Sequence, residues 1–95
     1  MASPFSVLLI PGLLIPSIVF HTLRSRIEYA GYKCLYPTFI VNLLVGDELA
    51  QLAKQLDVTG PVVLVGHSAG GLLAVTLARA KHPNVRAVIG LGTPL

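Results

Sequence analysis

The sequence predicts an α/β protein in which a parallel sheet of about four strands carries helices on both faces. Short apolar runs alternate along the chain with segments of helical periodicity, and those runs show no alternating polar face. The composition agrees, because 54% of the 95 residues are hydrophobic, 12% are charged and the mean hydropathy is +0.77. Strands that are buried on both faces explain such an apolar chain. We expect residues 1–95 to form a single domain.

The first half of the chain shows two strands and one helix. Residues 7–10 are a continuous apolar run that ends at Pro11-Gly12, as a strand with no wet face would. A helix is predicted from Ser17, a plausible N-cap, to Gly31, which stops it. Its apolar positions recur at helical spacing: Phe20, Leu23, Ile27 and Ala30. Residues 34–36 then predict a short strand, with Cys34, the only cysteine, as a buried small hydrophobe.

The second half continues the alternation of helix and strand. Asp47 is the expected N-cap of a helix, and Asp57 is expected in the turn that follows that helix. Residues 62–65 are a β-branched strand, residues 68–81 predict a helix, and residues 85–91 predict a fourth strand. With right-handed crossovers, the strand order is 2-1-3-4, so the first and third strands lie side by side at the switch point where ligands bind.

The motif Gly66-His67-Ser68-Ala69-Gly70 joins the third strand to its helix. A Gly-x-Ser-x-Gly segment in this position holds a serine on a sharp, strained turn with its hydroxyl exposed above the sheet. The turn needs glycine at both ends, because a side chain there would collide with neighbouring backbone. We therefore predict a nucleophile elbow with Ser68 as the catalytic nucleophile.

Two backbone amides are predicted to stabilise an oxyanion beside Ser68. The Ala69 N–H starts the helix, where unpaired amides and the helix dipole favour an anion. The second donor is expected after the first strand, at Leu13, which follows Pro11-Gly12. Each such donor contributes roughly 3 to 4 kcal/mol to transition-state stabilisation.

Residues 62–71, together with Pro11-Gly12 upstream and residues 90–94 downstream, resemble the central part of an α/β-hydrolase of the lipase and esterase kind. The resemblance implies a partial α/β-hydrolase fold and an acyl-enzyme formed at Ser68 from a small-molecule carboxylic ester. It also implies that an Asp or Glu and then a His follow the last predicted strand. We therefore expect these 95 residues to be the N-terminal portion of a serine hydrolase and to show little turnover alone.

The histidines that are present do not suggest a replacement for the missing base. His67 is the variable residue of the elbow and should point away from the Ser68 hydroxyl. His82 lies beyond the following helix, roughly 20 Å from Ser68 at 1.5 Å per residue. His21 is expected at the surface early in the first helix. The acids Asp47 and Asp57 precede the serine, whereas the triad acid of the family follows it.

A non-catalytic α/β module that binds an apolar small molecule or a protein partner is the alternative. Residues 13–15 and 37–40 follow strand ends, where they would either line a pocket for an acyl chain or pack in the core. The fourth strand would be a hydrophobic edge, which invites self-association.

Other function classes are disfavoured by composition and motifs. We expect no metal and no cofactor, since the sequence has one cysteine and neither a phosphate loop nor a complete dinucleotide fingerprint. The net charge of +3 comes from scattered cations, which argues against nucleic-acid binding. Prolines and a glycine interrupt the apolar stretch of residues 7–20, so no membrane span is expected. A cytoplasmic location is the expectation, with secretion as the minority alternative.

Overall fold

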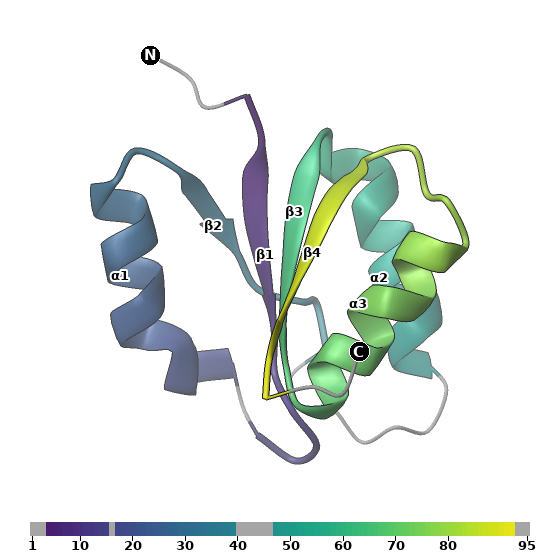
Figure 1. Cartoon of the computed structure of the whole chain (residues 1–95), viewed down its shortest axis with the longest axis horizontal. Coiled ribbons are helices and arrows are strands. Elements are labelled where there is room, and N and C mark those ends of the chain that lie inside the picture. Colours follow the sequence, from purple (N-terminus) through teal and green to yellow (C-terminus); the bar gives the residue numbers. More distant parts are fainter. Residues whose placement is uncertain (1–3, 16, 40–46, 93–95) are drawn as a thin grey trace.

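The computed structural model describes residues 4–15, 17–39 and 47–92 of the chain, and it shows the expected α/β architecture (Figure 1). One parallel sheet has the strand order β2-β1-β3-β4, which confirms the predicted topology. Its strands are β1 (Ser6–Ile10), β2 (Lys33–Leu35), β3 (Val62–His67) and β4 (Val85–Leu91). The helical elements are the 3-10 helix η1 (Ser17–Phe20), α1 (His21–Tyr29), α2 (Asp47–Thr59) and α3 (Ala69–Arg79).

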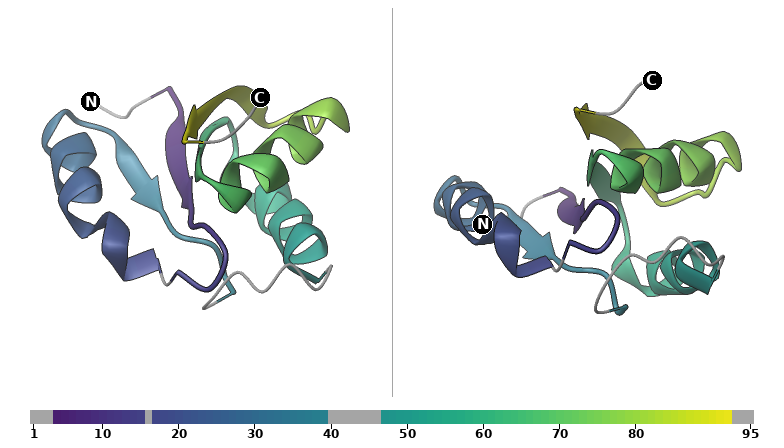
Figure 2. Two further views of the ribbon diagram at one scale, coloured as in Figure 1. Left: turned by 60° about the horizontal axis from the view of Figure 1, so that its bottom comes forward. Right: turned by 90° about the horizontal axis from the view of Figure 1, so that it is seen from below.

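The helices lie on opposite faces of the sheet, with α1 on one face and α2 and α3 on the other (Figure 2). This arrangement follows from the direction of the crossovers. The chain moves from β1 outward to β2 through α1, and it moves in the opposite direction to β3 and β4 through α2 and α3. With right-handed connections, reversal of direction places the helices on opposite faces and creates a switch point between β1 and β3.

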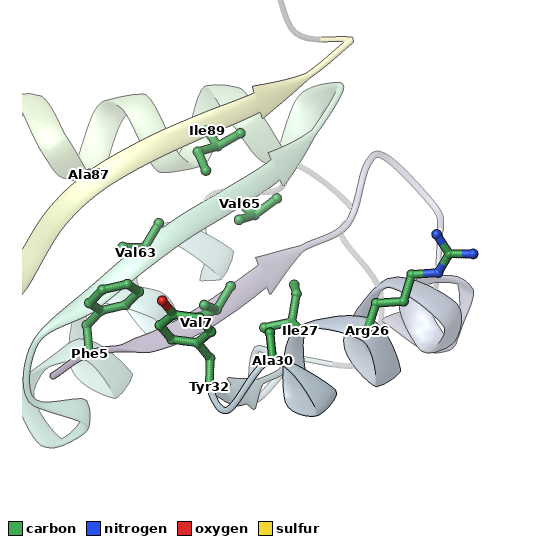
Figure 3. Close-up of a pocket in the computed structure, with 10 residues that line it drawn as sticks. All are labelled: Phe5, Val7, Arg26, Ile27, Ala30, Tyr32, Val63, Val65, Ala87 and Ile89. Carbon is green, nitrogen blue, oxygen red and sulfur yellow. The ribbon is translucent and has the colours of Figure 1, made fainter. Parts of the chain in front are cut away.

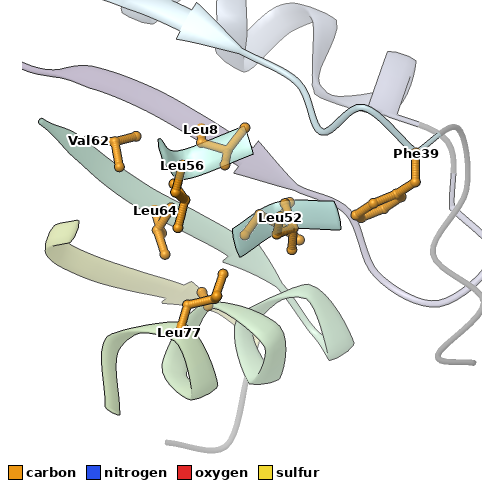
Figure 4. Close-up of a cluster of buried hydrophobic side chains, with 9 residues drawn as sticks. Leu8, Phe39, Leu52, Leu56, Val62, Leu64 and Leu77 are labelled. Atoms are coloured by element: carbon orange, nitrogen blue, oxygen red, sulfur yellow. The ribbon is translucent and has the colours of Figure 1, made fainter. Parts of the chain in front are cut away.

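Each face of the sheet has its own hydrophobic cluster. Under α2 and α3, buried side chains from β1 and β3 meet leucines of both helices (Figure 4): Leu8, Leu64, Leu52, Leu56 and Leu77. Under η1 and α1, the buried residues are Val7, Leu9, Phe20, Cys34 and Val65. Strand β1 is therefore buried on both faces, as predicted. Cys34 is 4% exposed, which confirms its predicted burial, and this burial raises the pKa of its thiol.

Strand β4 differs from the central strands. It pairs only with β3 among the described residues, so it forms an edge of the sheet. Its Val88 side chain packs against the cluster beneath α3, whereas the neighbouring Ile89 is 49% exposed on the opposite face (Figure 3). A hydrophobic edge was expected at this strand. The structure agrees, because among the described residues no helix covers the α1 side of β4.

Two local predictions need correction. Ser17 does not cap the α-helix, because the chain first forms η1 and the N-cap of α1 is Phe20. Asp57 is not in a turn, because it lies in the last turns of α2, which extends to Thr59. The predicted stop at Gly31 is confirmed. Its φ of 100° suits glycine, and the Tyr32 N–H donates to the Ile27 carbonyl in a 3.3 Å bond that closes a Schellman motif.

Candidate active site

The segment that joins β3 to α3 has the backbone of a sharp elbow. Strand β3 ends at His67, helix α3 begins at Ala69, and Ser68 alone makes the turn between them. Ser68 has a φ of 53° and a ψ of −117°, a conformation that residues with a Cβ rarely adopt. Its cost is about 1–3 kcal/mol, which the surrounding structure must offset. The side chain remains exposed at the carboxyl edge of the sheet.

Two glycines allow this turn to pack against the sheet. A Cβ on Gly66 would overlap the backbone of Gly70 and Gly71 at the start of α3. A Cβ on Gly70 would overlap the carbonyl groups of Ile10 and Pro11 at the end of β1. The collisions predicted from the motif are thus present, and both involve backbone atoms that cannot rotate away.

Hydrogen bonds hold the elbow between the end of β4 and the start of α3. The Ser68 N–H donates to the Leu91 carbonyl at 2.9 Å. The Gly71 N–H donates to the Ser68 carbonyl at 3.0 Å. These bonds fix the backbone on both sides of the Ser68 hydroxyl, so the strained conformation is determined by its neighbours rather than by its own preference.

Ser68→Gly is expected to raise the free energy of unfolding by about 1 kcal/mol, because glycine adopts a positive φ without steric cost. The same substitution at Ser25, an exposed residue within α1, should lower it by about 0.5–1 kcal/mol. Urea unfolding of both variants measures the difference. A Ser68→Gly variant as destabilised as Ser25→Gly would show that the elbow carries no strain.

The loop after β1 lies directly against the elbow. A Cβ on Gly12 would sit 3.2 Å from the His67 carbonyl oxygen and 3.5 Å from the Ser68 Cβ. The loop turns sharply, since the Ile15 N–H donates to the Gly12 carbonyl at 3.2 Å and Leu14 has a φ of 60°. Leu13 therefore directly follows Gly12, which packs against Ser68. This is expected when the first and third strands lie side by side.

Exposed apolar side chains occur on the segments that surround Ser68. Leu13 is 47% exposed and Leu14 is 62% exposed in the loop after β1. Leu72, one helical turn after the serine, is 48% exposed, and Leu91 at the end of β4 is 38% exposed. We call these four leucines the apolar rim. Of the second predicted pocket segment, Phe39 packs in the core instead, and Ile40 lies outside the described residues.

The histidines are distributed around the fold. His67 is exposed beside Ser68, with its Nδ1 facing Gly12, while His21 is exposed at the start of α1. His82 lies just before β4, at the amino ends of the strands, whereas Ser68 lies at their carboxyl ends. Its Nε2 is 2.8 Å from Asp57 Oδ1, and its Nδ1 accepts the Asn84 N–H at 3.2 Å. The predicted separation of His82 from Ser68 agrees with this topology, and the His82–Asp57 pair joins the ends of α3 and α2.

Gln55 holds a segment at the carboxyl ends of the strands, and no sequence pattern indicated this role. The Gln55 amide donates from Nε2 to the Tyr36 carbonyl at 2.9 Å and accepts the Thr38 N–H at Oε1 at 3.1 Å. It thereby fixes the segment that follows β2. A glutamine in the middle of a helix looks like any solvated position, and only its contact across 19 residues reveals this role.

No three histidine, cysteine, aspartate or glutamate side chains come together as metal ligands within residues 4–15, 17–39 and 47–92. In the same ranges, no helix has the length and apolar character needed to cross a membrane.

Comparison with known proteins identifies the fold and the family. The chain is similar to the crystal structure of a lipase-esterase related protein from Clostridium acetobutylicum ATCC 824, with a TM-score of 0.79 and 23% sequence identity. The match covers 96% of this chain and 42% of that protein, so the chain spans less than half the length of its structural relative. No curated protein matches the sequence. The model of the PGAP1-like alpha/beta domain matches residues 21–95. The chain has an α/β-hydrolase-like fold and belongs to the PGAP1-like alpha/beta domain family.

Proposed function

We propose that this chain supplies the nucleophile of a serine hydrolase that acts on carboxylic esters. The observation that carries the proposal is the strained backbone of Ser68, which presents an exposed hydroxyl between β3 and α3. A strained turn at the switch point of a parallel sheet is how a serine hydrolase exposes the hydroxyl of its nucleophile above the sheet. A structural serine at a helix start would adopt an ordinary N-cap conformation instead.

In the proposed reaction, the Ser68 Oγ attacks the ester carbonyl carbon and loses its proton to a general base. The carbonyl oxygen becomes an oxyanion, for which the N–H groups of Ala69 and Leu13 are the proposed donors. The position of Ala69 as the first residue of α3 supports its assignment, since the first amides of a helix have no partner within it. The proximity of Gly12 to Ser68 supports the assignment of Leu13. Collapse of the intermediate releases the alcohol, and water later hydrolyses the acyl-enzyme.

The apolar rim supports an ester with an apolar acyl group. Leu13, Leu14, Leu72 and Leu91 lie on the segments that meet at Ser68, and each is at least 38% exposed. An acyl chain that lay on these side chains would bury apolar surface on both partners, at about 25 cal/mol per Å².

We further propose that the general base and its carboxylate partner come from polypeptide outside residues 1–95. His82 uses both ring nitrogens at the opposite edge of the sheet, and His67 faces Gly12. The 95-residue chain alone should then hydrolyse esters no faster than its Ser68→Ala variant. Hydrolysis by the 95-residue chain that disappears in Ser68→Ala would contradict the external base.

A fluorophosphonate probe tests the nucleophile directly, because it reacts only with an activated hydroxyl. By the natural protein we mean the longer protein that, in this proposal, contains residues 1–95 and supplies the base. It should be labelled at Ser68, as located by mass spectrometry of the modified peptide. Labelling of the 95-residue chain should be at least about 100-fold slower, since no base activates its serine. A natural protein that is folded but unlabelled would instead favour the second candidate function, a non-catalytic module.

That second candidate is a module that binds an apolar molecule or a protein partner. It is favoured by the exposed apolar surface of β4, of which Ile89 is the clearest example. Self-association through the edge of β4 is one form that this binding would take.

A further inference from the structure

His67 lies where the elbow meets the loop that follows β1. Strand β3 extends one residue beyond its last pair with β1, because Ile10 pairs with Gly66 and His67 comes next. His67 is exposed at the carboxyl edge, and its Nδ1 would lie 3.4 Å from a Cβ on Gly12. The three atoms nearest to that Cβ position are the His67 carbonyl oxygen, the His67 Nδ1 and the Ser68 Cβ. The imidazole therefore packs against the loop.

Gly12 begins a turn whose central side chains are exposed. The Ile15 N–H donates to the Gly12 carbonyl at 3.2 Å, so Leu13 and Leu14 are the two central residues of a β-turn. The φ of 60° at Leu14 is typical of the third residue of a type II turn, a position that glycine usually occupies. Leu13 is 47% exposed and Leu14 is 62% exposed, so their side chains contribute little to fixing the turn. The contact of Gly12 with the elbow places this turn relative to Ser68.

The place of this turn matters for the proposed reaction, because the Leu13 N–H is the second proposed oxyanion donor. Such a donor is effective when it lies about 2.7–3.1 Å from the position that the oxyanion will occupy. A misplacement of about 1 Å can cost on the order of 100-fold in rate. His67 precedes Ser68 directly in the chain, so its ring links the turn to the nucleophile itself.

We propose that His67 is a positioning residue, whose imidazole packs on Gly12 and thereby holds the Leu13 N–H in place for the oxyanion. The role rests on the proposed function, because without a reaction at Ser68 there is no oxyanion to stabilise. It involves no proton transfer, which distinguishes it from the role of a general base. It requires only a planar group beside Gly12. Asparagine would retain such a group, since its side-chain amide reaches the position of the Nδ1.

Steady-state kinetics of the natural protein with a short-chain p-nitrophenyl ester tests this role. His67→Ala should lower kcat at least about tenfold and leave KM within about twofold, because the oxyanion forms only after the ester is bound. His67→Asn should keep kcat within about threefold of the parent, since the contact with Gly12 is restored. His21→Ala is the matched control, because it removes an exposed imidazole at the start of α1 and should change neither constant. Circular dichroism checks that each variant is folded.

Leu13→Pro shows whether His67 acts through the Leu13 N–H. Proline has no N–H, and it suits the second residue of a type II turn. Alone, this substitution should lower kcat by about 100-fold, the effect of one oxyanion donor. His67→Ala added to Leu13→Pro should lower kcat by no more than about twofold further, since the group that His67 positions is already absent. Losses that multiply in the double variant would overturn the proposal, as would an unchanged kcat in either single variant.

Ser68→Ala is measured alongside, so that the two proposals fail separately. If Ser68→Ala loses the activity while His67→Ala retains it, Ser68 remains the nucleophile and the role of His67 is wrong. If Ser68→Ala retains the parent rate, both the proposed function and the role of His67 are wrong.

Discussion

Gly70→Ala is expected to lower the free energy of unfolding by about 3 kcal/mol or more, a large part of the total stability of a domain of this size. The added methyl group would overlap the Ile10 and Pro11 carbonyl groups. These atoms belong to the end of β1, the most buried strand, so relief requires α3 to move away from the sheet. Urea unfolding followed by circular dichroism measures the loss.

Gly60→Ala is the control for this substitution. A Cβ on Gly60 meets no atom within 4 Å, but its φ of 70° gives alanine a conformational cost of about 1 kcal/mol. The two variants thus separate steric overlap from backbone preference. If both variants lost the same free energy of unfolding, α3 would be able to move away from β1 at little cost. The close approach of Gly70 to β1 would then impose no steric requirement for glycine.

Ser68→Ala should lower ester hydrolysis by the natural protein by about 10⁴-fold or more, because loss of the nucleophile leaves only substrate binding and the oxyanion donors. Folding should be retained, since alanine has the same Cβ and the Ser68 backbone bonds do not involve the hydroxyl. Initial rates with a short-chain p-nitrophenyl ester provide the measurement. Fluorophosphonate labelling should disappear in the same variant.

Ser25→Ala makes the same chemical change at an exposed position of α1 and should leave the rate unchanged. Retention of more than roughly 1% of the parent rate in Ser68→Ala would contradict the assignment of Ser68 as nucleophile, since such assignments predict far larger losses. Loss of activity in both serine variants would point to damage unrelated to the elbow.

The parts of the fold that sequence predicted best are those determined by local contacts. The apolar runs of β1 and β3 and the stop at Gly31 each depend on residues close together in the chain, and the structure confirms them. The strand β4 was also placed correctly, at Val85–Leu91. Which of its two faces a helix covers was not predicted, because an apolar strand sequence does not reveal whether a helix lies over each face.

The error at Asp57 and the open choice at Phe39 have a similar cause. Asp57 is a residue type common in turns, yet it extends α2 and meets His82, which lies 25 residues further along the chain. Phe39 was placed either in a pocket or in the core, and its packing with β1 and α2 decides for the core. Both outcomes depend on partners distant in sequence, which a local pattern does not contain.

For the candidate active site, the sequence by itself determined the elbow, because the glycines around Ser68 are the only residues that its tight turn sterically admits. It also determined which strand ends would meet there, through the right-handed crossovers of a parallel sheet. Only the tertiary structure decided which groups surround the serine: Leu91 as acceptor of its N–H, Gly12 against its Cβ, and His82 engaged elsewhere. Those contacts arise when segments up to 56 residues apart pack together, and packing at that range depends on the whole core rather than on any motif.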